Sequence, residues 1–190
     1  FVSERNGRRG ERGFLDDYAG YAYALLALRD ATLDSSYLDR AERMVNRAID
    51  DFYDDVHGGF YLYGREHESL ILRPKETYDG AIPSGNALMA AVLVRLQALR
   101  PTARTQAVLE AQLRFLSGEA AAYPAGHAMF LTALSDHLEP PPLVTAVPKT
   151  AADLRELPFL VPSDWVIQPL DGPTAAYPLK NNEAAFYVCK

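Results

Sequence analysis

The chain has 190 residues, enough for one hydrophobic core or for one core with a small appendage. Apolar residues make up 48% of the chain and charged residues 23%, the proportions of an ordinary soluble globular protein. The formal net charge of −6 argues against a nucleic-acid partner and against an anionic membrane surface, because both attract basic faces.

The first expected elements are a basic arm and two helices of different character. The arginines between Arg5 and Arg12 lie among glycines, which favours a flexible, solvated arm. From Phe14 to Ala31, apolar residues recur at helical spacing around nearly the whole circumference, so we expect an inner helix. From about Tyr37 to Phe52, apolar and charged residues occupy opposite faces, which predicts an outer helix.

A β-hairpin and three more helices are expected next. The runs 60–63 and 70–73 predict its two strands, and Gly58-Gly59 ends the helix before it. A helix from residue 85 or 86 to 99 is apolar on every side, and the next, 103–116, has a polar face. A further helix ends near residue 138. This alternation of inner and outer helices indicates stacked α-hairpins, one layer of which lines a barrel.

The character of the chain changes at Glu139-Pro-Pro-Pro142. Strand-like runs at 143–147, 164–167 and 185–189 and a short helix at 151–157 follow. We therefore predict a mainly α fold: helical hairpins with one inserted β-hairpin over 1–138, then a small β-rich appendage over 139–190. The single cysteine excludes an internal disulfide and favours a reducing, cytoplasmic location. No apolar run is long enough for a transmembrane helix.

Two carboxylates and a tyrosine begin the first inner helix. Carboxylates at a helix N-terminus satisfy free N–H groups and favour the dipole, so capping is the simplest interpretation. One aspartate suffices for a cap, and the second aspartate with the following tyrosine exceeds that need. We therefore take Asp17 as a candidate catalytic group, and Asp16 and Tyr18 as candidate substrate contacts.

The segment from Pro74 to Asn86 carries a second group of candidates. Its simplest interpretation is a loop with an Asp-Gly turn. Because it enters an inner helix, we expect its side chains to converge on the barrel rim that carries Asp17. We predict Asp79 and Glu76 as acid/base groups. The candidate substrate contacts here are Tyr78, Ser84 and Asn86.

Other chemistries find little support in the sequence. His57 and His67 form no i, i+4 pair, and the single cysteine excludes a zinc site built on cysteines, so we expect no metal site. No Gly-rich phosphate loop and no Gly-x-Ser-x-Gly elbow occurs, and we expect no cofactor.

Four ordered motifs resemble one family. They are Gly13–Ala19, Gly58–Tyr61, Arg73–Asn86 and Ala185–Cys189. Together they resemble the spermatogenesis-associated, thioredoxin-domain-fused family, whose bacterial members are often labelled YyaL-like. Members pair an N-terminal thioredoxin-like domain with a C-terminal α/α toroid similar to six-hairpin glycosidases and N-acylglucosamine 2-epimerases. The resemblance implies that this chain is a partial toroid that lacks the thioredoxin-like domain and the first toroid helices.

Two functions remain open at this point. The first is a carbohydrate-active toroid that hydrolyses or isomerises a sugar; the 11 tyrosines suit it, because aromatic faces stack on sugar rings. An epimerase would need a histidine base, for which only His127 or His57 could serve. The alternative is a non-catalytic scaffold that binds a ligand or protein for the thioredoxin-like domain. In either case we expect a missing N-terminal segment or another chain to cover the inner helices.

Overall fold

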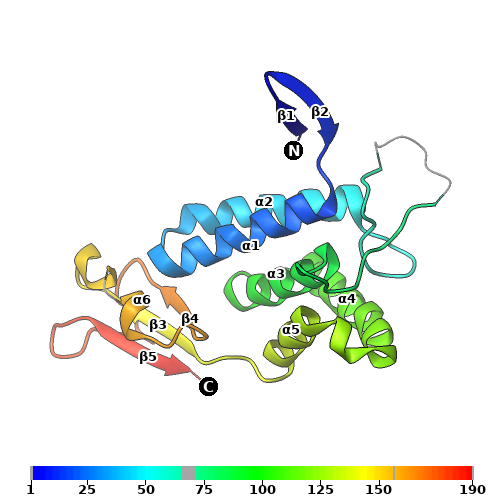
Figure 1. Ribbon diagram of the computed structural model, residues 1–190. Helices are drawn as coiled ribbons and strands as arrows, with labels where there is room; N and C mark the ends of the chain where they lie inside the picture. The colour runs from blue at the N-terminus through cyan, green and yellow to red at the C-terminus, as the bar shows by residue number, and fades with distance from the viewer. Residues whose placement is uncertain (1, 66–71, 156, 190) are drawn as a thin grey trace.

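The computed structural model describes residues 2–65, 72–155 and 157–189, and it is mainly helical (Figure 1). The long helices are α1 (Leu15–Thr32), α2 (Ser35–Phe52), α3 (Gly85–Leu99), α4 (Ala103–Ala122) and α5 (Ala128–Leu138). The short helical turns are η1 (Pro124–Gly126), η2 (Ala151–Leu154) and α6 (Leu157–Leu160). The strands are β1 (Val2–Arg5), β2 (Arg8–Arg12), β3 (Leu143–Val147), β4 (Val166–Pro169) and β5 (Ala185–Cys189). Within these described ranges, no helix combines the length and the apolar character needed to cross a membrane.

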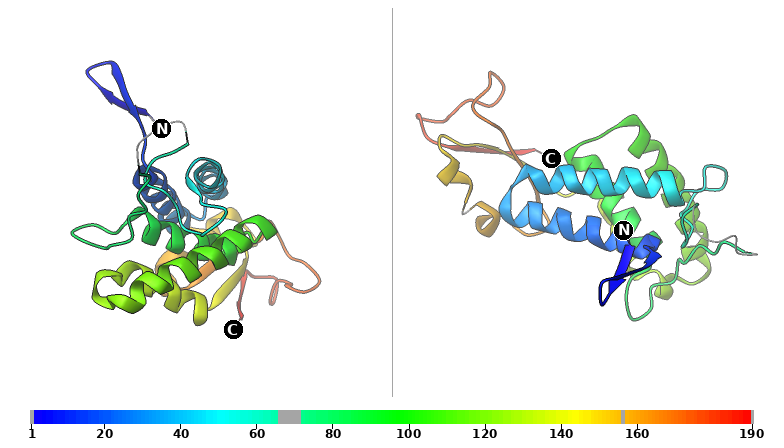
Figure 2. Two further views of the ribbon diagram at one scale, coloured as in Figure 1. Left: turned by 90° about the vertical axis from the view of Figure 1, so that its right-hand side faces the viewer. Right: turned by 90° about the horizontal axis from the view of Figure 1, so that it is seen from above.

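The helices pack as consecutive pairs around α3. Helix α1 packs against α2 and α3, and α3 also packs against α4 and α5. The right-hand view of Figure 2 shows α1 and α2 side by side, with the remaining helices beneath them. Helix α2 buries one face only, whereas α3 is buried over most of its length. The predicted distinction between an outer and an inner helix is therefore confirmed for these two.

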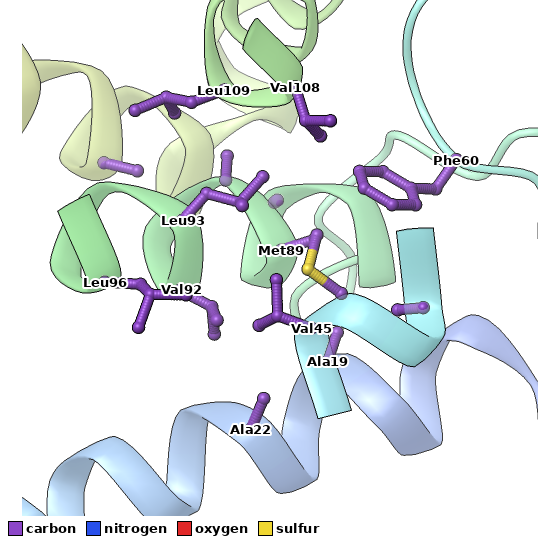
Figure 3. Packing of buried hydrophobic residues seen from close by; sticks show 14 of the residues in the cluster. Ala19, Ala22, Val45, Phe60, Met89, Val92, Leu93, Leu96, Val108 and Leu109 are labelled. Carbon is purple, nitrogen blue, oxygen red and sulfur yellow. The ribbon is translucent and has the colours of Figure 1, made fainter. Parts of the chain in front are cut away.

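The core is built mainly from small and branched side chains on five helices. Figure 3 shows Ala19 and Ala22 of α1 and Val45 of α2 facing the side chains of α3, with Leu109 of α4 on its other side. Alanines on α1 allow the helix axes to approach, and leucine, valine and methionine fill the space between them. Phe60, which is completely buried, closes one end of this core from the loop after α2.

Side-chain caps fix the N-termini of α2, α3 and α4. Asp34 accepts a hydrogen bond of 2.8 Å from the N–H of Ser36 at the start of α2. Ser84 accepts one of 3.2 Å from Ala87 N–H, and Thr102 accepts one of 3.1 Å from Thr105 N–H. Caps of this kind stabilise a helix start by about 1 kcal/mol each, which is why these boundaries were readable in the sequence.

The predicted β-hairpin does not form in its described part. Residues 60–65 and 72–73 contain no strand, and residues 66–71 lie outside the described ranges. The reason is that side chains occupy the backbone groups a strand would need: Asn86 bonds both Phe60 N–H (2.8 Å) and Phe60 C=O (2.9 Å). Leu62 N–H donates to Pro74 C=O at 2.9 Å, so the two arms still meet.

The expected flexible arm at the N-terminus is a two-stranded hairpin instead. Strands β1 and β2 pair antiparallel across Asn6 and Gly7, whose φ angles are 55° and 73°. Asn-Gly is the dipeptide that most readily adopts a tight hairpin turn with both φ angles positive. The charged strands lack the apolar alternation that would have revealed the hairpin in the sequence.

The C-terminal appendage is a three-stranded sheet of order β4-β3-β5, with β3 parallel to β4 and antiparallel to β5. The predicted ranges of the first and last strands are confirmed, and the predicted helix at 151–157 divides into η2 and α6. Ala146, Leu157 and Ile167 form a small second core with Leu33 at the end of α1. Val166 packs into the helical core. The domain boundary near residue 138 stays a prediction, because apolar contacts cross it.

Candidate functional site

The N-termini of helices α1, α3 and α5 lie together at one end of the helical layer. A Cβ atom on Gly85 would come within 2.2 Å of Asp16 Oδ1, so α1 and α3 begin side by side. Asp79 bonds the N–H of Ser84 (2.9 Å) at the start of α3 and the N–H of Met129 (2.8 Å) at the start of α5. We call these three N-termini, with residues 74–84, the rim. The appendage lies at the opposite end of α1 (Figure 1).

Asp17 and Asp79, two of the predicted catalytic groups, use their carboxylates to hold the backbone of the rim. Asp17 Oδ2 accepts a hydrogen bond of 2.8 Å from the N–H of Phe14, just before α1. Asp79 accepts from Ser84 N–H and Ser84 Oγ through Oδ1 and from Met129 N–H through Oδ2. Both residues therefore lie at the predicted end of the helices, where each fixes a helix start.

Asp16 and Glu76 are two further carboxylates of the rim. Both side chains reach solvent. Burial by surrounding atoms raises the pKa of Asp16, a hydrogen bond from the Gly85 backbone partly opposes this, and the charges of Asp17 and Glu76 raise it further. A carboxylic acid that keeps its proton above its usual pH range can act as a general acid. Asp16 was predicted only as a substrate contact, because the sequence could not show what lies beside it.

An aromatic surface continues from Glu76 along the same segment. The rings of Tyr78 and Tyr123 lie nearly parallel, 6° apart with centroids at 6.3 Å, and both residues are more than half exposed. Gly126 lies against both rings, since a Cβ there would come within 2.6 Å of Tyr78 and 2.7 Å of Tyr123. Exposed parallel rings provide flat apolar faces with polar hydroxyls at their edges, the combination that suits sugars.

The remaining predicted substrate contacts, Tyr18, Ser84 and Asn86, are buried and take part in packing or hydrogen bonding within the fold. Tyr18 packs in the core against Phe52, with ring centroids at 5.1 Å. Ser84 caps α3 and donates to the C=O of Thr77 at 3.1 Å. Asn86 is completely buried, and its side-chain amide is used in full by Phe60, Gln112 and the C=O of Glu76. Asn86 therefore positions the backbone of Glu76 from beneath the rim.

His127 ends the rim on the side of α5. It is buried, and its Nδ1 lies 2.9 Å from the C=O of Tyr123, which can only accept a hydrogen bond. Nδ1 must therefore carry the proton, and the lone pair is on Nε2. Nε2 has no hydrogen-bond partner within the described part of the chain. Burying a basic nitrogen without a hydrogen-bond donor costs free energy. In the described part of the chain, His127 therefore has a ring nitrogen that is not used by the fold.

The sequence did not indicate the hydrogen-bond network around Asp54. Asp54 is buried after α2 and accepts hydrogen bonds from Lys75 Nζ (2.7 Å), Tyr61 Oη (2.7 Å) and the N–H groups of Val56 and His57. Burial alone would raise the pKa of Asp54, but these bonds outweigh it and hold that pKa well below its usual range. Lys75 Nζ also lies 4.8 Å from the ring centroid of Phe115. Nothing in the separate runs around Asp54 and Lys75 signals their pairing.

No cluster of three or more His, Cys, Asp or Glu residues suited to a metal ion occurs among the residues that the structure describes. His57 has its Nδ1 3.3 Å from Asp54 Oδ2, with the rest of its side chain largely exposed. The rim is thus an arrangement of carboxylates, aromatic rings and one buried imidazole.

Comparison with known proteins finds partial relatives. No family model matches the chain. The chain is similar to spermatogenesis-associated protein 20 of Rattus norvegicus, with 40% identity over 89 residues, which is 46% of this chain and 11% of that protein. The Homo sapiens protein of the same name is 39% identical over 85 residues, 44% of this chain and 11% of its own length. These matches support the resemblance to the spermatogenesis-associated family, over less than half of this chain and about a tenth of the relatives.

Proposed function

We propose that the rim binds a carbohydrate and that Asp16 and Glu76 are its acid/base pair. The observation that carries this proposal is a pair of solvent-reaching carboxyl groups from separate segments of the rim: Asp16 lies beside Gly85, and Glu76 is near enough for its charge to raise the pKa of Asp16. Asp16, with its raised pKa, would donate a proton to a glycosidic oxygen. Glu76 would act as the ionised partner. Glycosidases need such a pair, with different separations for retention and for inversion of the anomeric centre.

Other side chains of the rim would bind the sugar or position the acid/base pair. Tyr78 and Tyr123 would stack on a sugar ring. Asp17 and Asp79 were the first catalytic candidates; their hydrogen bonds favour a positioning role, in which they hold the starts of α1, α3 and α5. Isomerisation instead of hydrolysis would need a basic nitrogen that reaches the substrate. Nε2 of His127 is buried, which favours hydrolysis.

The test compares the chain with four variants by glycan array, isothermal titration and an assay of sugar turnover. Asp16→Asn and Glu76→Gln should remove turnover but keep binding, and Tyr78→Ala should weaken binding at least tenfold. Gly85→Ala should act like Asp16→Asn, because the new Cβ displaces the Asp16 carboxyl. Asp171→Asn, at an exposed aspartate of the appendage, is the matched control. Binding that survives Tyr78→Ala unchanged would contradict the assignment.

The second candidate is a scaffold that binds a ligand or protein without catalysis. The capping roles of Asp17 and Asp79 favour it, because a scaffold uses rim carboxylates to fix helix starts. The two functions separate in one experiment. Carbohydrate that binds but is never converted, with Asp16→Asn behaving as the unaltered chain, would leave the scaffold as the function of the rim.

A further inference from the structure

One pocket of the described part of the chain lies away from the rim. A pocket of about 630 Å³ is lined by the C-terminal halves of α1 and α3, by two residues of α4, by α5 and by the segments that lead into β3 and β4. Its position is close to the junction between the helices and the appendage. Pockets of 300–1,000 Å³ at such junctions are the usual sites of small organic ligands. No residue of the proposed carbohydrate site lines it.

The pocket exists because three helices carry small residues where they face it. Ala27 of α1, Ala91 and Ala98 of α3 and Ala133 of α5 all contribute to its wall. Larger side chains at these positions would fill the space, as leucine and valine do in the core. Most of the remaining wall is also apolar, as in ligand pockets generally. The apolar contributors include Leu26, Val94, Leu109, Met129 and Val166.

One ion pair in the wall is already complete. Arg95 donates to Asp30 Oδ2 through Nε at 3.2 Å and through Nη2 at 2.8 Å, and Arg29 donates to Asp30 Oδ1 at 3.1 Å. Arg95 Nη2 also lies 3.3 Å from the C=O of Trp165. These bonds join α1 to α3 in the wall of the pocket. They leave Asp30 without free capacity for a ligand cation.

Two of the uncommitted polar groups of the pocket are acidic. Asp136 of α5 and Asp164 before β4 are exposed, and neither has a hydrogen-bond or ion-pair partner in the described part of the chain. His137 lies beside Asp136. Tyr23, whose side chain is 45% exposed, presents an aromatic ring to the same space. Two unpaired carboxylates and an aromatic face attract a cation that also has an apolar body.

We propose that this pocket binds an amphipathic amine, a molecule with an aliphatic or aromatic body and a protonated amino group. The body lies against the alanine-rich wall formed by Ala27, Ala91 and Ala98. The ammonium group pairs with the carboxylates of Asp136 and Asp164, and the Tyr23 ring of the same wall offers a cation–π surface. The pocket is independent of the rim, so each site can be tested while the other is intact.

The test uses fluorescence titration with two matched probes. Dansylcadaverine has an apolar naphthalene body and an ammonium group, and dansylglycine has the same body with a carboxylate. We expect saturable binding of dansylcadaverine and at least tenfold weaker binding of dansylglycine. The double variant Asp136→Asn/Asp164→Asn should weaken dansylcadaverine binding about tenfold. It should also reduce the difference in affinity between the two probes. Equal binding of the two probes would overturn the ligand class.

Pocket-filling variants locate the site. Ala27→Trp and, independently, Ala98→Trp place a large ring on exposed wall positions and should each remove dansylcadaverine binding. Ala24→Trp changes an exposed alanine of α1 outside the pocket and is the matched control. Circular dichroism of all three checks that the helices form. Unaltered dansylcadaverine binding by both pocket variants would overturn the proposal, and Asp16→Asn should leave this binding unchanged.

Discussion

Two aspartates of this chain occupy opposite extremes of electrostatic environment. Asp54 is buried and surrounded by donors, and its pKa lies well below the usual range. Asp16 reaches solvent at the rim beside two other carboxylates, and its pKa is raised. An ionised aspartate thus stabilises the fold at position 54, whereas at position 16 its surroundings disfavour the ionised form. The comparison teaches that a carboxylate suited to chemistry is one that the fold has left without enough donors.

Removing the cation from the satisfied region should have the largest effect. Lys75→Met leaves the Asp54 carboxylate buried without its ammonium partner, and breaking such a buried pair costs about 3 kcal/mol. The free energy of unfolding, measured by urea denaturation, is the readout. Lys149→Met, at an exposed lysine that lies 3.8 Å from Glu183, should change it by less than about 0.5 kcal/mol. Equal values for the two variants would show that the buried pair contributes nothing.

The next effect concerns the amide beneath the rim. Asn86→Ala leaves the buried N–H and C=O of Phe60 without partners, and each unsatisfied buried group is costly, so we expect a loss of about 2 kcal/mol. Asn46→Ala removes an amide that bonds Arg104 on the surface at 3.2 Å and serves as the control. A loss no larger than that of the control would mean that water replaces the Asn86 amide.

A pH titration tests the Asp54 side of the comparison. Because its folded-state pKa is depressed, the unfolded chain takes up a proton first as the pH falls, and folding loses stability below the usual aspartate pKa of about 4. Each pH unit in that window should cost up to about 1.4 kcal/mol. In Asp54→Asn this share of the slope should be missing, so the two unfolding free energies should converge as the pH falls from 5 to 3. Parallel curves would contradict the depressed pKa.

The sequence revealed the elements better than the site. Periodicity and caps located the helices and the strands at 143–147 and 185–189, because those signals are local. The hairpin expected after α2 did not form in its described part, because the Asn86 side chain, 26 positions away, occupies the backbone of Phe60. The two segments singled out for the site, which contain Asp17 and Asp79, meet where α1 and α3 begin. The choice among Asp16, Asp17 and Asp79 depends on neighbours such as Gly85 and Met129, which no local pattern shows.

The smallest effect tests the rim side and has the opposite sign. A raised folded-state pKa means that ionised Asp16 burdens the fold at neutral pH, and that the burden disappears below the usual aspartate range. Asp16→Asn should therefore change the free energy of unfolding by no more than about 0.5 kcal/mol at pH 7, as expected for a surface-reaching residue. Relative to the unaltered chain, the variant should gain stability as the pH rises from 3 to 7.

Asp171→Asn, outside the rim, is the control, and urea denaturation across this pH range measures both variants. A variant that instead lost stability with rising pH would mean that the Gly85 N–H stabilises the Asp16 anion more than burial disfavours it. In that case Asp16 would belong with Asp17 and Asp79, as a third carboxylate that holds a helix start. The proton donor of the proposed reaction would then have to be Glu76, and Glu76→Gln alone would remove turnover.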